Sequence, residues 1–289
     1  MFQMTIVFIG RAVRFSPNSI DKDAAILAAV RSRLVATGWQ CEEILPEEKL
    51  VEQWLDGNAG KSGQGCLDNR GLVGAVVSMG RSQNTLNKIG ELEHQGFPVV
   101  NGTASVMLCN QRVLLMQVLE QAGVTVPPLT GDDGYWVKRG YGCRETADDV
   151  RFVPDMLSAE AAVEEMHQRG LATVDVRAHV VGRWVKFYGV HETNFFRCYD
   201  EEGTVPRDFD EDAVRAMAEN AAETVSLDVY GGDCIIRHDG QPVLVDLNDW
   251  PSFSPCRDEA AEAIAQCVRK KIASLPEAFW QVKQALAQE

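Results

Sequence analysis

The first hundred residues alternate short apolar runs with longer segments in which hydrophobic positions recur at helical spacing. The apolar runs predict strands at residues 5–9, 41–45, 72–77 and 97–101. The helical spacing predicts helices at residues 20–37 and from 82 or 84 to 95, and a polar, glycine-rich stretch at 56–65 predicts a surface loop. This βαβ alternation predicts a small parallel sheet, whose functional edge lies at the carboxyl ends of its strands.

Strands and helices continue to alternate after residue 102. A single helix is predicted at residues 103–121, because Gly123 ends it and two prolines that follow prevent its continuation. Further helices are predicted at residues 158–170, 210–225 and from 258 onward, and strands at 135–138, 173–181 and 183–190. The whole pattern therefore predicts an α/β protein.

Residues 231–251 predict a β-hairpin, since two alternating segments flank a turn that contains an Asp-Gly pair. Because strand side chains alternate between two faces, Asp246 and Asn248 are expected to project together and away from Val245. Asp233 can meet them from the partner strand. Two carboxylates and an amide oxygen are hard ligands, which suit magnesium carrying nucleotide phosphates. A hairpin with a polar outer face is the alternative that this pattern leaves open.

Composition narrows the class of protein. The chain has 289 residues, 45% of them hydrophobic, which is enough for a sizeable core in two or three lobes. No apolar run approaches the roughly 18 residues of a membrane span, so a cytoplasmic location is expected. The net charge of −14 opposes binding to nucleic acid or anionic membranes and favours small-molecule partners. The eight cysteines lack metal-binding spacing and are expected to be reduced thiols.

The order of several segments resembles the ATP-grasp superfamily. These segments are residues 100–103, 109–112, 121–128, 135–138, 182–189 and the hairpin. The set is most similar to glutathione-synthetase-like and ribosomal-protein-modifying ligases, and its Asp-x-Asn motif also resembles that of inositol phosphate kinases. The resemblance implies an α/β chain with an α+β ATP-grasp core. Its expected parts are an N-terminal substrate domain at residues 1–100, a central lobe at 101–175, and a C-terminal lobe with the magnesium site at 176–289.

The resemblance also implies which cations contact ATP. Lys138 matches the family's phosphate-binding lysine at the end of a strand, and Arg112 stands where an earlier lysine is usual. Lys186 is expected to reach phosphate or substrate, and Arg197 matches a phosphate-binding arginine that would act in catalysis together with Lys138. The alternative for each is a surface cation or a cross-strand ion pair with one of the many acidic residues.

Two further sites follow from the same resemblance. The hinge that contacts adenine matches Arg177, Ala178 and His179, whose backbone groups are expected to bind the base. His179 is otherwise a packed strand residue. The family's metal triad matches three residues of the hairpin that would hold Mg²⁺ or Mn²⁺, namely Asp233, Asp246 and Asn248. Many ligases carry Glu at the position of Asp246, so this motif departs from the usual one.

Candidate substrate contacts come from two other places. Arg14 and Arg81 follow predicted strands of the first sheet and are candidates to bind the acidic group of the substrate, because a guanidinium binds a carboxylate bidentately. Either is otherwise a solvated loop arginine. Arg257 ends the loop after the hairpin, where it would line a substrate pocket or pack against the protein.

The leading functional hypothesis is a Mg²⁺- and ATP-dependent ligase that joins a carboxylate to an amine or thiol through an acyl phosphate. A small-molecule kinase of the same fold, which phosphorylates a hydroxyl, is the alternative. A nucleotide-binding module without catalysis is a third hypothesis, which the phosphate-binding lysine and the three metal ligands disfavour. Related ligases often form dimers or tetramers, so a homo-oligomer is a further expectation.

Overall fold

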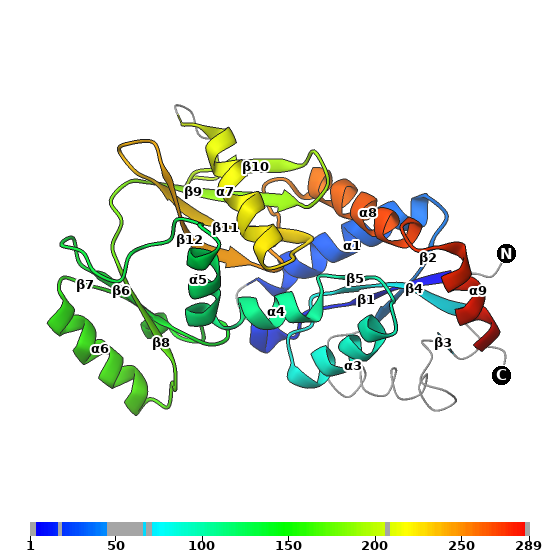
Figure 1. The fold of residues 1–289 in the computed structure, drawn as a ribbon, viewed down its shortest axis with the longest axis horizontal. Helices are drawn as coiled ribbons and strands as arrows, with labels where there is room; N and C mark the ends of the chain where they lie inside the picture. Colours follow the sequence, from blue (N-terminus) through cyan, green and yellow to red (C-terminus); the bar gives the residue numbers. More distant parts are fainter. Residues whose placement is uncertain (1–3, 17–18, 45–65, 68–70, 206–208, 287–289) are drawn as a thin grey trace.

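The computed structural model of the chain describes residues 4–16, 19–44, 66–67, 71–205 and 209–286. Within these described residues, three β-sheets follow one another, and helices pack on each of them (Figure 1). The loop expected at residues 56–65 lies outside the described residues. None of the described helices is long and apolar enough to cross a membrane.

The first sheet has the predicted parallel βαβ arrangement. Its parallel strands, in the order β2-β1-β4-β5, are β1 Met4–Ile9, β2 Gln40–Ile44, β4 Gly71–Ser78 and β5 Val99–Val100. The short β3, Cys66–Leu67, pairs antiparallel with β4. Helix α1, Ile20–Ala36, packs on one face and α3, Gln83–His94, on the other. Phe8 accordingly joins the core on the α1 side, whereas Val7 and Ile9 join the core on the α3 side.

The central lobe contains two consecutive helices and a small antiparallel sheet. The helices are α4 Thr103–Cys109 and α5 Arg112–Gln121. The sheet, in the order β7-β6-β8, consists of β6 Tyr135–Arg139, β7 Val150–Val153 and β8 Val174–Ala178, with α6 Met156–Gln168 packed on it. The strand β7 was not predicted from the sequence.

The prediction of one helix at residues 103–121 is wrong. The helix breaks at Gln111, whose φ of −113° and ψ of 76° are not helical. The N–H of Arg112 donates a hydrogen bond to the carbonyl of Gly140 instead of continuing α4. A new helix therefore begins at Arg112, next to the end of β6.

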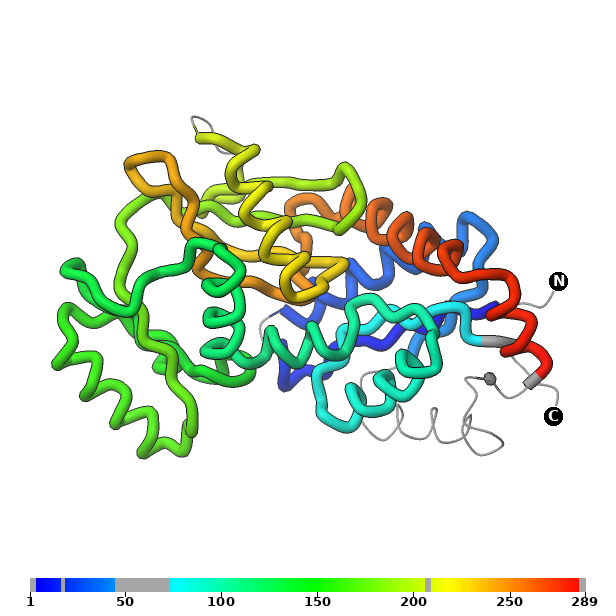
Figure 2. The backbone as a smooth tube through the Cα atoms, viewed as in Figure 1, coloured from blue at the N-terminus to red at the C-terminus, as the bar shows by residue number. Residues whose placement is uncertain are grey.

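The third sheet is antiparallel, in the order β10-β9-β11-β12. Its strands are β9 Arg183–Val190, β10 Phe196–Tyr199, β11 Val229–Ile236 and β12 Pro242–Asn248, of which β10 was not predicted. Helix α7, Glu211–Thr224, packs on this sheet together with α5. The chain then returns to the first sheet, where α8 Arg257–Ala273 packs beside α1 and α9 Glu277–Leu286 lies at the end where β1 begins (Figure 2). The lobe boundary expected after residue 175 falls inside β8.

The hairpin contains a bulge that the regular alternation did not predict. Asp233 pairs with Asp246, but the next residue, Cys234, pairs with Leu244, so Val245 is the extra residue of β12. Leu244 is consequently buried in the core with α7, and Val245 turns toward the cleft described below. The predicted separation of Val245 from the face of Asp246 is therefore wrong, although the hairpin itself is confirmed.

Candidate functional site

Two adjoining cavities, of about 380 and 430 Å³, lie between the three-stranded and the four-stranded sheet. Both are lined by Lys138 and Val150 from the first of these sheets and by Trp184 and Val245 from the second. The cavities therefore form one continuous cleft. We call the smaller cavity, which includes the predicted hinge, the apolar compartment, and the larger cavity, which includes Asp246, the polar compartment.

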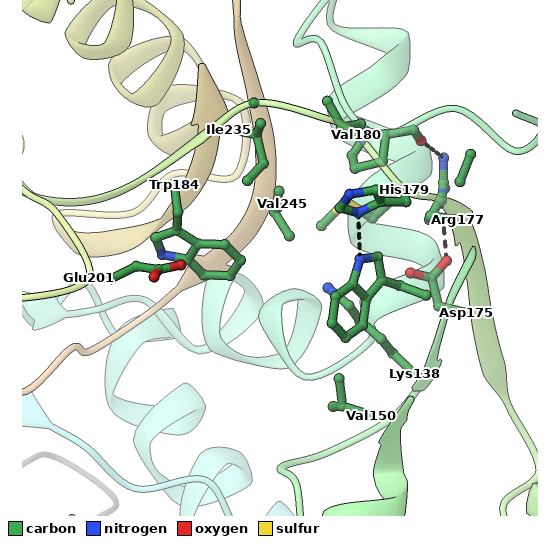
Figure 3. Close-up of a pocket in the computed structure, with 15 residues that line it drawn as sticks. Lys138, Val150, Asp175, Arg177, His179, Val180, Trp184, Glu201, Ile235 and Val245 are labelled. Atoms are coloured by element: carbon green, nitrogen blue, oxygen red, sulfur yellow. Dashed lines mark hydrogen bonds and ion pairs between the residues drawn. The ribbon is translucent and has the colours of Figure 1, made fainter. Parts of the chain in front are cut away.

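The apolar compartment takes its walls from both sheets. Trp184, Ile235 and Val245 lie on the side of the four-stranded sheet, opposite Arg177 and His179 of the central lobe (Figure 3). A concave and largely apolar space with a few polar groups at its edge is typical of a small-molecule site. A flat heterocycle such as a nucleotide base suits its composition.

The predicted hinge residues Arg177, Ala178 and His179 all line this compartment. The guanidinium of Arg177 is buried, and its Nε lies 3.2 Å from Asp175 Oδ1 while Nη1 donates to a backbone carbonyl at 3.2 Å. Nδ1 of His179 accepts a hydrogen bond from Nε1 of Trp136 at 3.1 Å. Both side chains thus make polar contacts within the central lobe.

Two cations face one carboxylate in the polar compartment. Nη1 of Arg112 lies 3.0 Å from Oδ1 of Asp246, and this carboxylate raises the pKa of Arg112 against the opposing effect of burial. Burial, followed by the charge of Arg112, lowers the pKa of Lys138. Burial alone would raise the pKa of Asp246, but Arg112 and Lys138 together hold it below its usual value. Two neighbouring cations of this kind suit phosphate oxygens.

The three predicted metal ligands lie together. Asp233 is directly across from Asp246 on the neighbouring strand, and Nδ2 of Asn248 donates to Oδ2 of Asp246 at 3.3 Å. Nζ of Lys186 lies 2.7 Å from Oδ1 of Asp233. Burial nevertheless keeps the pKa of Asp233 above its usual value, against the charge of Lys186.

This donor set fits a hard divalent cation such as Mg²⁺, because it offers carboxylate and amide oxygens without sulfur or imidazole. In the part of the chain that the structure describes, no group of three or more His, Cys, Asp or Glu side chains could hold a metal ion. A cation bound at this hairpin would therefore depend on the amide oxygen of Asn248 in addition to Asp233 and Asp246.

The other end of the polar compartment is built from the carboxyl ends of the first sheet. Arg81, just after β4, forms an ion pair with the buried carboxylate of Asp249. Arg11, just after β1, is also buried, and its Nη2 donates to the carbonyl of Trp250 at 3.2 Å. Asn101, just after β5, donates to the carbonyl of Asp249. Three strand ends thus hold the backbone that follows Asn248.

Four predicted site residues line neither compartment, namely Lys186, whose ion pair with Asp233 is given above, and Arg14, Arg197 and Arg257. Arg14 lies exposed in the short helix η1, Val13–Phe15, with its guanidinium 4.7 Å from the centre of the Phe15 ring. Arg197 on β10 pairs with Glu259 at the start of α8. Arg257 is the first residue of α8, and its Nε is buried without a hydrogen-bond partner.

Comparisons with known proteins give matches in structure but not in sequence. No protein-family model and no curated protein matches the chain. A RimK domain ATP-grasp protein from Sphaerobacter thermophilus superposes with a TM-score of 0.64 at 19% identity, over 92% of this chain and 99% of its own. VanG D-Ala:D-Ser ligase from Enterococcus faecalis gives 0.66 at 17% identity, over 94% of this chain and 99% of its own. The chain has the ATP-grasp fold.

D-alanyl-alanine synthetase A from Vibrio cholerae has the same fold, with a TM-score of 0.66 at 12% identity over 95% of this chain and all of its own. The resemblance stated from the sequence is confirmed at the level of the fold. Within the ATP-grasp fold of this chain, the cleft between the lobes brings together nine of the predicted residues, namely Arg81, Arg112, Lys138, Arg177, Ala178, His179, Asp233, Asp246 and Asn248. Lys186 joins them through its ion pair with Asp233.

The ATP-grasp cleft also contains residues that the sequence interpretation missed. Arg11 directly follows a predicted strand of the first sheet, which is the same signal that selected Arg81. Trp184 is an aromatic residue two positions before Lys186, on the same face of β9. Asp249 follows the metal motif directly, but only the fold shows that its carboxylate is buried against Arg81.

Proposed function

We propose that this protein is a Mg²⁺- and ATP-dependent ligase that joins a small carboxylate to an amine or thiol. The observation that carries the proposal is the arrangement around Asp246, where Arg112 and Lys138 lie next to the predicted magnesium ligands and Lys138 also lines the apolar compartment. Such an arrangement suits a nucleotide whose base occupies the apolar compartment and whose phosphates extend into the polar one.

The proposed reaction has two steps. A carboxylate oxygen of the substrate attacks the γ-phosphorus of ATP, so that an O–P bond forms and the bond to ADP breaks. The nitrogen of an amine, or the sulfur of a thiol, then attacks the carbonyl carbon of this acyl phosphate. Inorganic phosphate leaves with the former carboxylate oxygen, and the proton of the attacking group passes to solvent or phosphate.

This chain's own residues would act by positioning and by charge. Lys138 and Arg112 would bind the transferred phosphoryl group as its charge shifts toward ADP. Asp233, Asp246 and Asn248 would hold Mg²⁺, which when bound neutralises charge on the phosphate oxygens. No nucleophilic side chain is needed, because the substrate itself attacks ATP.

Several solved neighbours favour a ligase over a kinase. They include a D-Ala:D-Ser ligase, a D-alanine–D-alanine ligase crystallised with ATP, and D-cycloserine synthetase. The names of these proteins describe their own reactions.

The test is to incubate the protein with ATP, Mg²⁺ and a pooled metabolite extract, and to follow ADP, inorganic phosphate and new masses. Equal amounts of ADP and phosphate together with a condensed product support a ligase. A product that is heavier by one phosphoryl group, without free phosphate, would establish a kinase instead. The Asp246→Asn variant is the matched control, and ADP formation at the wild-type rate in this variant would contradict the assigned site.

A further inference from the structure

The polar compartment has a second group of charges, separate from the group around Asp246. The charged groups that act most strongly on Lys138 are Arg112, Asp246, Asp175 and Asp233. The groups that act most strongly on Arg11 are others, namely Arg81, Asp249, Asp23 and Cys143. The cleft therefore contains two charged regions, and we call the one formed by Arg11, Arg81 and Arg144 the distal region.

The distal region is enclosed on several sides. Arg11 and Arg81 come from the first sheet, Phe15 from η1, and Cys143 and Arg144 from the connection between β6 and β7. Sγ of Cys143 lies 3.4 Å from the carbonyl of Arg14, so this connection touches η1. A substrate that extends from the phosphates would thus meet a bounded space rather than open solvent.

Positive charge exceeds negative charge in this space. The carboxylate of Asp249 is engaged by Arg81. Asp23, which is buried behind the cavity on α1, lies 3.6 Å from Nε of Arg11. Nε and Nη2 of Arg144 donate to the backbone carbonyls of residues 146 and 147 at 3.0 and 3.2 Å. Three guanidinium groups are therefore matched by two carboxylates among the described residues of the distal region.

Arg11 is the most buried of the three guanidinium groups. It is 7% exposed, and its Nε is buried without a hydrogen bond. Burial, followed by repulsion from Arg81, lowers the pKa of Arg11 to about 10. An anionic group bound in the part of the cavity that Arg11, Arg81 and Arg144 line would supply the missing charge, and a planar carboxylate matches the donor geometry of a guanidinium.

We propose that the substrate carries a second carboxylate, which does not react, and that the distal region binds it. This inference rests on the proposed function, since the reacting carboxylate would lie near Lys138 and Arg112, in the other charged region. A dicarboxylic acid or acidic amino acid would place one carboxylate in each region. Substrates with a single carboxylate and an apolar remainder would leave the three distal guanidinium groups matched by only two of the described carboxylates.

The test is a binding measurement without ATP, by isothermal titration calorimetry at low ionic strength. The probes are malonate, succinate, glutarate and adipate, each paired with its monomethyl ester, together with L-aspartate and L-glutamate paired with their amides. Each pair differs by one negative charge at nearly constant size. At least one diacid is expected to bind about tenfold more tightly than its partner, which corresponds to about 1.4 kcal/mol.

Three variants test which residues cause the preference for a diacid over its monoester or amide. Arg144→Gln changes an exposed residue and is expected to remove the preference without changing stability. Arg11→Lys keeps the charge but loses the forked geometry, and is expected to reduce the preference. Arg237→Gln, an exposed change on the hairpin turn, should leave it intact. Equal binding within every pair, or a preference that survives in both Arg144→Gln and Arg11→Lys, would overturn the proposal.

The same panel separates this inference from the proposed ligase activity. ADP formation that is stimulated only by monocarboxylates would overturn the distal site while the ligase proposal stands. Charge-selective binding that Arg144→Gln removes supports the distal site even if no acceptor leads to phosphate release, in which case the ligase proposal fails alone.

Discussion

Arg81 and Asp249 form an ion pair that joins the carboxyl end of β4 to the residue after Asn248. The carboxylate of Asp249 is 1% exposed and the guanidinium of Arg81 is 11% exposed, so water stabilises neither charge well. The backbone of Asp249 is held in addition by Asn101, whose amide also bonds to the N–H and carbonyl of Val229 on β11. The first sheet therefore positions the end of the predicted magnesium motif.

Replacement of one partner of this pair is expected to be strongly destabilising. Arg81→Met leaves the buried carboxylate of Asp249 without its cation, and breaking a buried pair costs about 3–5 kcal/mol. Chemical denaturation should show this loss in the free energy of unfolding.

The double variant Arg81→Met/Asp249→Leu removes both charges and is the matched control. It should recover most of the lost stability, because an apolar pair of similar volume replaces the ions. Catalytic turnover should stay low, since the residue after Asn248 loses its ion pair with the first sheet. Equal unfolding free energies for wild type and Arg81→Met would show that the pair has no structural role.

The protonated side chain of Lys138 is expected to lower the stability of the folded protein while it supports catalytic activity. Its folded-state pKa lies below the usual 10.5 because of burial and Arg112. Between these two pKa values the unfolded chain binds more protons than the native state, so stability rises with pH in this window. The protonated lysine therefore costs stability at neutral pH, and Lys138→Met should raise Tm at pH 7 while reducing turnover about a hundredfold or more.

Lys22 on α1 provides the control, because it is exposed and lines neither compartment. Lys22→Met should change neither Tm nor turnover. The alkaline limb of the wild-type pH profile should begin below pH 10.5, and Lys138→Arg should move it to higher pH. A lower Tm for Lys138→Met would contradict the inferred cost of this buried charge.

Arg112 is expected to contribute to both stability and nucleotide affinity. Arg112→Met leaves Asp246 without its partner at 3.0 Å, at a cost of about 1–3 kcal/mol, and weakens ATP binding about tenfold or more. Arg112→Lys retains the charge and should lose less of both. ATP affinity can be measured by equilibrium dialysis. If Arg112→Met bound ATP as tightly as wild type, Arg112 would not be part of the phosphate site.

A variant of Arg197 tests whether this residue contacts phosphate, as the sequence resemblance implied. The resemblance implied a phosphate contact, whereas the structure places the guanidinium beside Glu259, with both side chains about half exposed. Surface pairs of this kind contribute about 0–1 kcal/mol. Arg197→Gln should therefore leave the rate of ADP formation within a factor of about two, and a loss of turnover with retained folding would instead support the role expected from the sequence.

The order of elements could be predicted from the sequence where each element has a strong local signal. The parallel βαβ unit was predictable because apolar runs alternate with amphipathic helices. The helix break at Gln111 was not, since helical spacing continues through it and a long-range bond from Arg112 to Gly140 decides the outcome.

Site residues could be predicted where they belong to a sequence motif. They were harder to predict where only the tertiary structure brings them into the cleft. Lys138 and Asp246 belong to recognisable segments, and both line the polar compartment. The bulge at Val245 depends on pairing with β11, so strict alternation assigned its side chain to the wrong face. Arg14 and Arg11 stand in the same loop, and only the packing of that loop decides that Arg11 is the one buried in the cleft.

Trp184 is expected to contribute to ATP affinity, because its indole lines both compartments where the two sheets face each other. Trp184→Ala removes apolar contact area from the proposed base site and should raise the Kd for ATP about tenfold, or about 1.4 kcal/mol. Trp184→Phe keeps an aromatic ring and should raise it less. Both variants should retain the wild-type Tm within a few degrees, since Trp184 is only partly buried. If ATP bound equally well to wild type and Trp184→Ala in equilibrium dialysis, the base would have to lie outside the apolar compartment.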